Sequence, residues 1–186
     1  PKFKKESRQA LTQGYYDIGK KVDDVIATQF KYLPKTPLEI KPYEEFREKY
    51  EAGGSYQQGT PDGSRPGAYY VNTIDMRGVP IFEMETLAHH EAIPGHHMQI
   101  AIAQELKDLP IFRRMVPFTA FAEGWALYAE RLAWEAGFEK NPMDNLGRLQ
   151  AEMFRAVRLV VDTGMHAKHW TREQAIQYMS DNTGMG

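Results

Sequence analysis

Cysteine is absent from the 186 residues of this chain. Its absence excludes disulfide bonds, thiolate metal ligands and a cysteine nucleophile, and it does not decide between a reducing and an oxidising compartment. No uninterrupted apolar run reaches about 18 residues, so we expect no membrane-spanning helix. An excess of one charge sign is also missing, since the net charge is -2 and the pI about 6.4. We therefore expect no nucleic-acid-binding surface and no surface for anionic membranes.

A starting methionine is missing as well. The chain begins at Pro1 without a signal-like segment and stops at Gly186, soon after a helical pattern. Hydrophobic residues make up 42% and charged residues 26%, which is ordinary for a globular domain. We interpret the chain as one compact piece of a longer protein.

The apolar pattern predicts an α+β fold that is predominantly helical. Helical spacing predicts one or two helices in residues 1–33, and residues 44–52 predict one or two further helical turns. Residues 38–41 alternate like a short strand, and residues 68–73 are rich in β-forming residues. The run 53–67 between them, rich in glycine, proline and serine, is expected to be a loop.

The second half of the chain is predicted to be mainly helical. The expected helices are residues 83–106, 118–136 and 144–162, and a fourth that opens at the capping box of Thr171 and Gln174. The first should be interrupted at Pro94 and Gly95, and the third should break at Gly164.

Residues 89–97 hold the densest group of metal-ligating residue types. They read His-His-Glu-Ala-Ile-Pro-Gly-His-His, and contain four of the six histidines of the chain. In a zincin helix, two histidines one turn apart bind zinc, and a glutamate beside the first takes a proton from the metal-bound water. Zinc lowers the pKa of that water from about 15.7 towards about 7. The pattern predicts Zn²⁺ as cofactor, His90 as a ligand and Glu91 as the general base.

The spacing departs from the usual zincin motif, because Pro94 stands four residues after His90. In a straight helix His96 would lie about 120° round and about 9 Å along the axis from His90, too far to share one ion. Pro94 removes a helical hydrogen bond, and with Gly95 beside it a local bulge can return His96 to the face of His90. We therefore predict His96 as the second ligand, with His97 as the alternative.

Residues 90–97, His-Glu-Ala-Ile-Pro-Gly-His-His, resemble the HExxPGHH motif of a bacterial family of domains of unknown function, number 885 in its series. The resemblance continues in residues 121–130 and 158–166. That family is grouped with the gluzincin metallopeptidases, and its members are several times longer. The resemblance implies a gluzincin-like scaffold with a small sheet and a kinked metal-binding helix. We expect residues 1–186 to be a single catalytic-lobe fragment, with a helical and strand lead-in over 1–58 and the zinc-site region over 66–186.

The resemblance also implies roles for residues outside the histidine cluster. Gluzincins take a third ligand from a glutamate on the next helix, which here is Glu123; an unpaired carboxylate in its apolar surroundings would also be costly. They use a late histidine or tyrosine to stabilise the oxyanion, a role that falls to His166, with a helix-capping histidine as the alternative. Glu130, one heptad after Glu123, is a candidate to support a ligand.

Two further features could contact a substrate. Arg158 lies on one helical face with Arg155 and Asp162, and it either holds a substrate carboxylate or pairs with Asp162. The strand at residues 68–73 is expected to offer an exposed sheet edge to a peptide, as in peptidases of this type.

The sequence thus predicts a zinc-dependent hydrolase of peptide-like amide bonds, with Glu91 as the base for water and then the acid for the leaving amine. The expected partner is a peptide or peptide-like substrate, and an extracytoplasmic location in a bacterium is favoured over a cytoplasmic one. The alternatives are a zinc hydrolase of another substrate and a non-catalytic module that keeps the zincin helix. The intact Glu91 argues against the second, because a binding module needs no base there.

Overall fold

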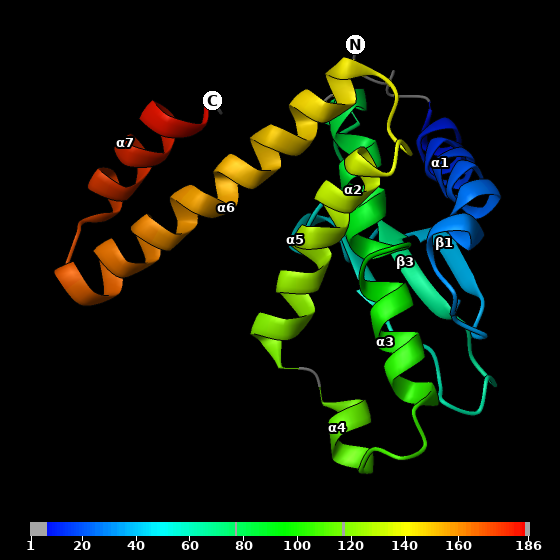
Figure 1. Ribbon diagram of the computed structural model, residues 1–186. Helices are drawn as coiled ribbons and strands as arrows, with labels where there is room; N and C mark the ends of the chain where they lie inside the picture. Colours follow the sequence, from blue (N-terminus) through cyan, green and yellow to red (C-terminus); the bar gives the residue numbers. More distant parts are fainter. Residues whose placement is uncertain (1–6, 77, 117, 185–186) are drawn as a thin grey trace.

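The computed structural model describes residues 7–76, 78–116 and 118–184 (Figure 1). Its first helix, α1 (Arg8–Gln29), confirms the helical reading of the amino-terminal region as one element. Helices α1 and α2 (Met84–Glu91) pack together over a small sheet, with a buried core that includes Leu11, Tyr69 and Ala88. The prediction of an α+β fold that is predominantly helical is confirmed.

The sheet has three strands in the order β1-β3-β2. Strand β1 (Leu38–Pro42) runs parallel to β3 (Gly67–Val71), with Leu38 opposite Gly67, and β2 (Gly54–Gln57) runs antiparallel to β3, with Gly54 opposite Val71. Strand β2 falls inside the run that was expected to be a loop, so that expectation is wrong. Backbone pairing with β3 outweighs the low strand propensity of its glycine and serine.

The position of β3 corrects a second expectation. Residues 68–73 were expected to form an exposed edge, but β3 is the central strand and both of its sides are paired. The two edges are β1, which contacts α1, and β2, which contacts α2. An isolated sequence segment does not reveal which neighbours will pair with it, because strand order depends on long-range contacts.

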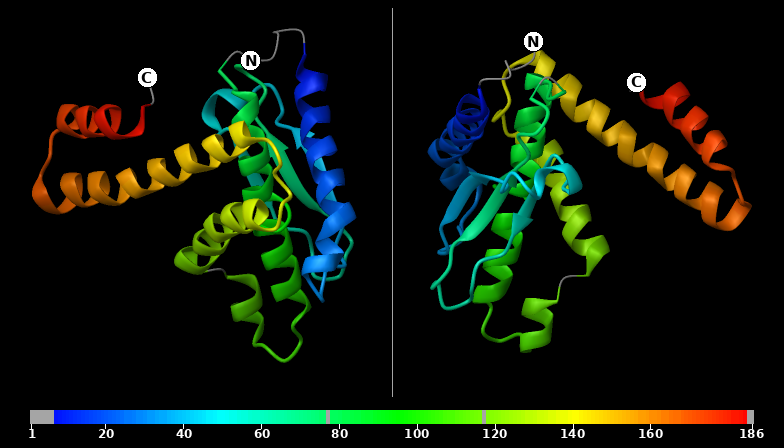
Figure 2. Two further views of the ribbon diagram at one scale, coloured as in Figure 1. Left: turned by 45° about the horizontal axis from the view of Figure 1, so that its top comes forward. Right: turned by 180° about the vertical axis from the view of Figure 1, so that it is seen from behind.

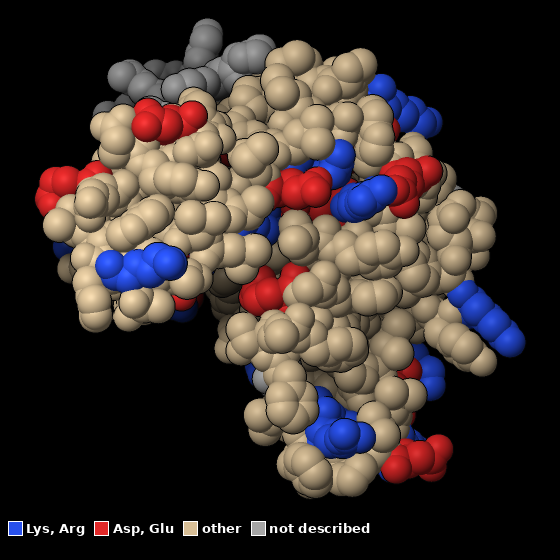
Figure 3. Space-filling view, turned by 60° about the vertical axis from the view of Figure 1, so that its left-hand side comes forward, with Lys and Arg blue, Asp and Glu red and all other residues tan. Residues whose placement is uncertain are grey.

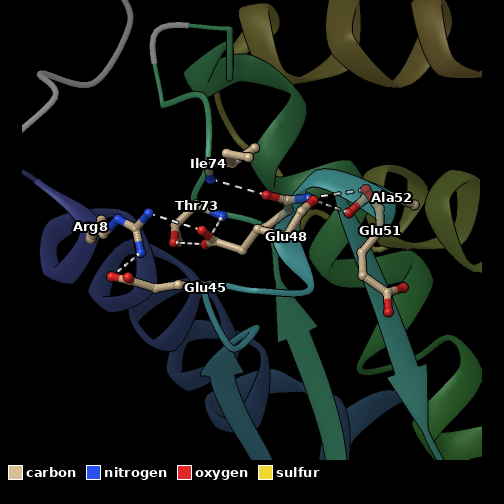
Figure 4. Close-up of polar contacts among 8 residues, drawn as sticks. Arg8, Glu45, Glu48, Glu51, Ala52, Thr73 and Ile74 are labelled. Carbon is tan, nitrogen blue, oxygen red and sulfur yellow. Dashed lines mark hydrogen bonds and ion pairs between the residues drawn. The ribbon is translucent and has the colours of Figure 1, made fainter.

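A buried glutamate ties α1 to the end of the sheet (Figure 4). Glu48, in the short 3-10 helix η1 (Glu48–Tyr50), accepts hydrogen bonds from the backbone and hydroxyl of Thr73 and pairs with Arg8 at 2.9 Å. Beside it, the Asn72 side chain donates to the carbonyls of Glu48 and Glu51 at 2.7 and 3.0 Å. These bonds fix the segment that leads directly into β2.

The remaining helices follow the predicted order with one addition. After the 3-10 turn η2 (Ile81–Glu83) come α2, α3 (His96–Glu105) and α5 (Thr119–Glu135). A short helix, α4 (Ile111–Met115), lies between α3 and α5. Helix α5 contacts both α2 and α3, so three helices meet around the break between α2 and α3.

Helices α6 (Pro142–Lys168) and α7 (Arg172–Thr183) form an arm that projects from the body (Figures 1 and 2). The predicted break at Gly164 is wrong, because α6 continues through it to Lys168. A Cβ at Gly164 would come within 2.4 Å of the Trp170 ring, so the glycine makes room for α7 to fold back. The predicted capping box of Thr171 and Gln174 is confirmed.

The surface shows mixed charge. On the face in Figure 3, lysine and arginine side chains are interspersed with aspartate and glutamate, without one broad basic patch. No helix in the described ranges combines the length and apolar character needed to cross a bilayer.

Candidate metal centre

The break between α2 and α3 brings the histidines of residues 89–97 to their positions. Helix α2 ends at Glu91, and α3 begins at His96 after a turn through Pro94 and Gly95. A Cβ at Gly95 would lie 1.9 Å from the His90 carbonyl oxygen, so only glycine fits this turn. The Trp125 indole of α5 donates to the Pro94 carbonyl at 2.8 Å and holds the turn against α5.

Three side chains converge on one point beside this break. The Nε2 atoms of His90 and His96 lie 3.4 and 3.6 Å from the two carboxylate oxygens of Glu123, which comes from α5. One ligand atom from each residue lies within 4.8 Å of the others, and the two imidazole rings meet edge to face at 4.7 Å. The structure therefore brings together His90, His96 and Glu123, as the sequence predicted.

The contacts on the far side of the His90 ring bear on which ring nitrogen carries the proton. His90 Nδ1 lies 2.7 Å from Glu130 Oε1, which can only accept, and 3.1 Å from Arg155 Nη2, which can only donate; we assign the proton to Nδ1 because the carboxylate contact is the shorter. In the neutral ring, Nε2 then carries a lone pair that faces a Glu123 carboxylate oxygen, and a bound cation between the two atoms would satisfy both. The donor set of two imidazoles and one carboxylate fits Zn²⁺.

Glu130 and Arg155 support this arrangement from α5 and α6. Glu130 is buried, and Arg155 Nη2 donates to its Oε1 at 2.6 Å, so the carboxylate is neutralised and fixed in place. A carboxylate that orients a ligating histidine is a common feature of metal sites. The sequence indicated Glu130 by its heptad spacing from Glu123, but no local signal indicated that Arg155, 25 residues further on, would contact it.

Burial sets the protonation of His96 and Glu91. The Glu123 side chain is 58% exposed, so the expectation that it lies in apolar surroundings is wrong. Burial, and next the neighbouring His90, lowers the pKa of His96 to about 4, so His96 is neutral at pH 7, as a ligand must be. Burial raises the pKa of Glu91 to about 7, which is the range that suits a general base. Glu91, His90, His96 and Glu123 all line one cavity of about 760 Å³.

The other two histidines point away from this cavity. His97 Nδ1 lies 3.0 Å from the Tyr56 hydroxyl of β2, and His89 Nδ1 lies 3.2 Å from the Ile93 carbonyl. Both line a separate cavity against α1. Of the two candidates for second ligand, His96 and not His97 joins the cluster.

His166 does not join the cluster of His90, His96 and Glu123. It is exposed near the end of α6, and that end of the helix lies far from α2 in both views of the arm (Figure 2). The expectation placed His166 after a break at Gly164, from where it could turn back; the unbroken α6 carries it outward instead. Within the described residues, the oxyanion role predicted for His166 has no geometric support.

The cavity wall includes two elements that a substrate would meet. Residues 52–56, from the segment before β2 into the strand, line it on the sheet side, and Arg155 and Arg158 line it on the α6 side. Arg158 and Asp162 form no ion pair in the part of the chain that the structure describes. The alternative reading of Arg158 as the partner of Asp162 is therefore unsupported.

A family match covers residues 1–186 and is described as "Bacterial protein of unknown function (DUF885)". The chain belongs to this family. The resemblance stated from residues 90–97 is thus confirmed at the level of the family, whose function is unknown.

A solved structure extends the comparison. The crystal structure of "the putative lipoprotein from Colwellia psychrerythraea" is similar to this chain, with 45% sequence identity and a TM-score of 0.92. The similarity covers 100% of this chain and 32% of that one, so the chain spans about a third of that protein. Among curated proteins, none matches the chain.

Proposed function

We propose that this chain carries the metal centre of a zinc-dependent hydrolase of peptide-like amide bonds. The observation that supports the proposal most directly is the convergence of His90, His96 and Glu123 within 4.8 Å, beside Glu91 and in one cavity. When bound, zinc would act as a Lewis acid that polarises the scissile carbonyl and lowers the pKa of water at the site.

The chain's own residues supply the proton transfers in this proposal. Glu91 takes the proton of the attacking water and then delivers it to the leaving amine. The elevated pKa of Glu91 suits both proton transfers near neutral pH, because the carboxylate is then a strong enough base and the carboxylic acid a strong enough acid. Glu130 and Arg155 keep the His90 ring in one orientation, through the 2.7 and 2.6 Å contacts at Glu130 Oε1.

The edge of the sheet supports a peptide substrate. Strand β2 is paired only with β3, so its outer edge offers backbone donors and acceptors, and it borders the cavity that holds Glu91. An extended peptide can add to such an edge as a further strand. The name of the Colwellia psychrerythraea relative supports an extracytoplasmic location for the protein that carries this chain.

The test is the variant Glu91→Gln in the full-length protein. We expect about one zinc per chain in wild type and variant, and a fall of about 10² or more in the hydrolysis of a quenched fluorogenic peptide library. Glu105→Gln is the matched control, because Glu105 ends α3 and pairs with Lys35 outside the cavity.

Three outcomes would contradict the proposal. Unchanged hydrolysis in Glu91→Gln would remove Glu91 as the base. A wild-type protein that holds zinc but cleaves no peptide would point to a non-peptide substrate or to a non-catalytic module. A wild-type protein without zinc, and with no gain of zinc on addition of the metal, would remove the cofactor.

A further inference from the structure

Two arginines of α6 line the cavity one helical turn apart, and they differ in their partners. Arg155 is fully engaged, with Nη2 donating to Glu130 at 2.6 Å and Nη1 to the Ala151 carbonyl at 3.0 Å. Arg158 makes no hydrogen bond or ion pair with any described residue. Arg155 thus supports the proposed metal centre, whereas the guanidinium of Arg158 is available to a ligand in the cavity.

The setting of Arg158 suits a planar anion. Its guanidinium lies over the Phe154 ring, with its carbon 5.6 Å from the ring centroid. Stacking on an aromatic ring restrains the plane of a guanidinium and leaves its N–H edges available. Those edges match the two oxygens of a carboxylate, which a guanidinium binds through paired hydrogen bonds.

None of the carboxylates in the described ranges pairs with Arg158. Among the cavity residues, Glu130 is held by Arg155 and His90, and Glu123 faces the two ligand histidines. The side chain of Arg158 is exposed to solvent at the cavity wall, so a ligand in the cavity can reach it.

We infer that Arg158 is a subsite for a carboxylate group of the substrate, which makes the hydrolase selective for peptides that carry a carboxylate near the scissile bond. The inference rests on the proposed function. The carboxylate has two possible sources, the free carboxyl terminus of a peptide and an acidic side chain, and the same guanidinium would bind either.

The experiment measures binding without hydrolysis, in the zinc-loaded full-length Glu91→Gln protein. Three probes are titrated by calorimetry: acetyl-trialanine with a free carboxyl terminus, the same peptide as its amide, and an amide with aspartate at the central position. We expect one of the two carboxylate probes to bind about 10- to 100-fold more tightly than the trialanine amide, which is the scale of a charge-assisted pair. The probe that gains identifies the source of the carboxylate.

The variants assign that preference to the residue. Arg158→Gln should abolish it, Arg158→Lys should retain part of it, and Arg172→Gln on α7 should leave it unchanged. Equal binding of all three probes, or a preference that survives Arg158→Gln, would overturn the inference. A second measurement uses Arg158→Gln in the otherwise wild-type protein. If its kcat falls equally for free-acid and amide substrates, without a change in binding, the inference is also overturned, since Arg158 would then act on the transition state.

The binding readout separates this inference from the proposed function. If the wild-type protein hydrolyses no peptide but binds the carboxylate probes in an Arg158-dependent way, the proposed function fails and the subsite stands. If hydrolysis is observed with no Arg158-dependent preference, the proposed function stands and the subsite fails.

Discussion

The two faces of the α2–α3 break carry two histidine pairs with opposite surroundings. All four side chains are buried, and each member of one pair is the sequence neighbour of a member of the other. On one face, His90 and His96 direct Nε2 at the carboxylate of Glu123. On the other, His97 and His89 contact the Tyr56 hydroxyl and the Ile93 carbonyl.

This contrast shows that residue type and burial do not distinguish the two histidine pairs. The group that each histidine contacts distinguishes the two pairs. The Tyr56 hydroxyl can donate to the Nδ1 lone pair of neutral His97, and the contact is complete without an added ion. The lone pair of a neutral His90 faces the Glu123 carboxylate, and a positive charge completes that contact, either a bound cation or a proton on Nε2. The contacts on one face are therefore complete without an added ion, and the other is the face on which we propose that a metal binds.

The largest expected effect is on zinc content. His90→Ala or His96→Ala removes one of the three proposed ligands, and we expect zinc affinity to fall by well over the roughly 10- to 100-fold that loss of a supporting residue costs. His89→Ala and His97→Ala are matched controls of equal burial and should keep zinc, although they lose stability. Elemental analysis after dialysis against a weak chelator measures both. If His97→Ala lost zinc while His89→Ala kept it, the contrast between the two faces would be wrong, and His97 would be a ligand.

A change in the turn should disturb both faces at once. In Gly95→Ala the new Cβ would meet the carbonyl oxygens of His90 and His89 at 1.9 and 2.3 Å, and backbone cannot yield as a flexible side chain does. We expect a loss of about 3 kcal/mol or more in the free energy of unfolding by urea, together with a loss of zinc.

The control for this change is Gly124→Ala, beside the proposed ligand Glu123. Nothing lies within 4 Å of a Cβ at Gly124, which is inside α5, so alanine should stabilise by about 0.5–1 kcal/mol and leave zinc in place. A Gly95→Ala protein as stable as wild type would show that the turn can relax, and that the position of His96 depends less on Gly95 than its geometry suggests.

The sequence could predict the parts of the site that rest on local chemistry. Proline has no N–H and glycine has no Cβ, so Pro94 and Gly95 indicated the break that brings His96 back to His90. Partners distant in sequence could not be predicted in the same way. Pairing of Gly54–Gln57 with β3, the contact of Arg155 with Glu130, and room for Trp170 at Gly164 all depend on how whole elements pack. The misplacement of His166 follows from the last of these, because Gly164 looked like a helix break without Trp170 beside it.

The smallest effect on stability should come from the face that holds His89 and His97. Tyr56→Phe keeps the ring that packs edge to face on His97 at 5.5 Å but removes the hydroxyl that contacts Nδ1. Burial lowers the pKa of His97 to about 4, so the ring stays neutral at pH 7 and loses a hydrogen bond rather than an ion pair. We expect a loss of about 1–2 kcal/mol in the free energy of unfolding, the cost of one unpartnered buried acceptor. Tyr50→Phe, at a largely exposed tyrosine, should change stability by less than about 0.5 kcal/mol. Zinc content measured on the same samples should stay at the wild-type value in both; a fall in Tyr56→Phe would mean that the face assigned to folding also holds the metal.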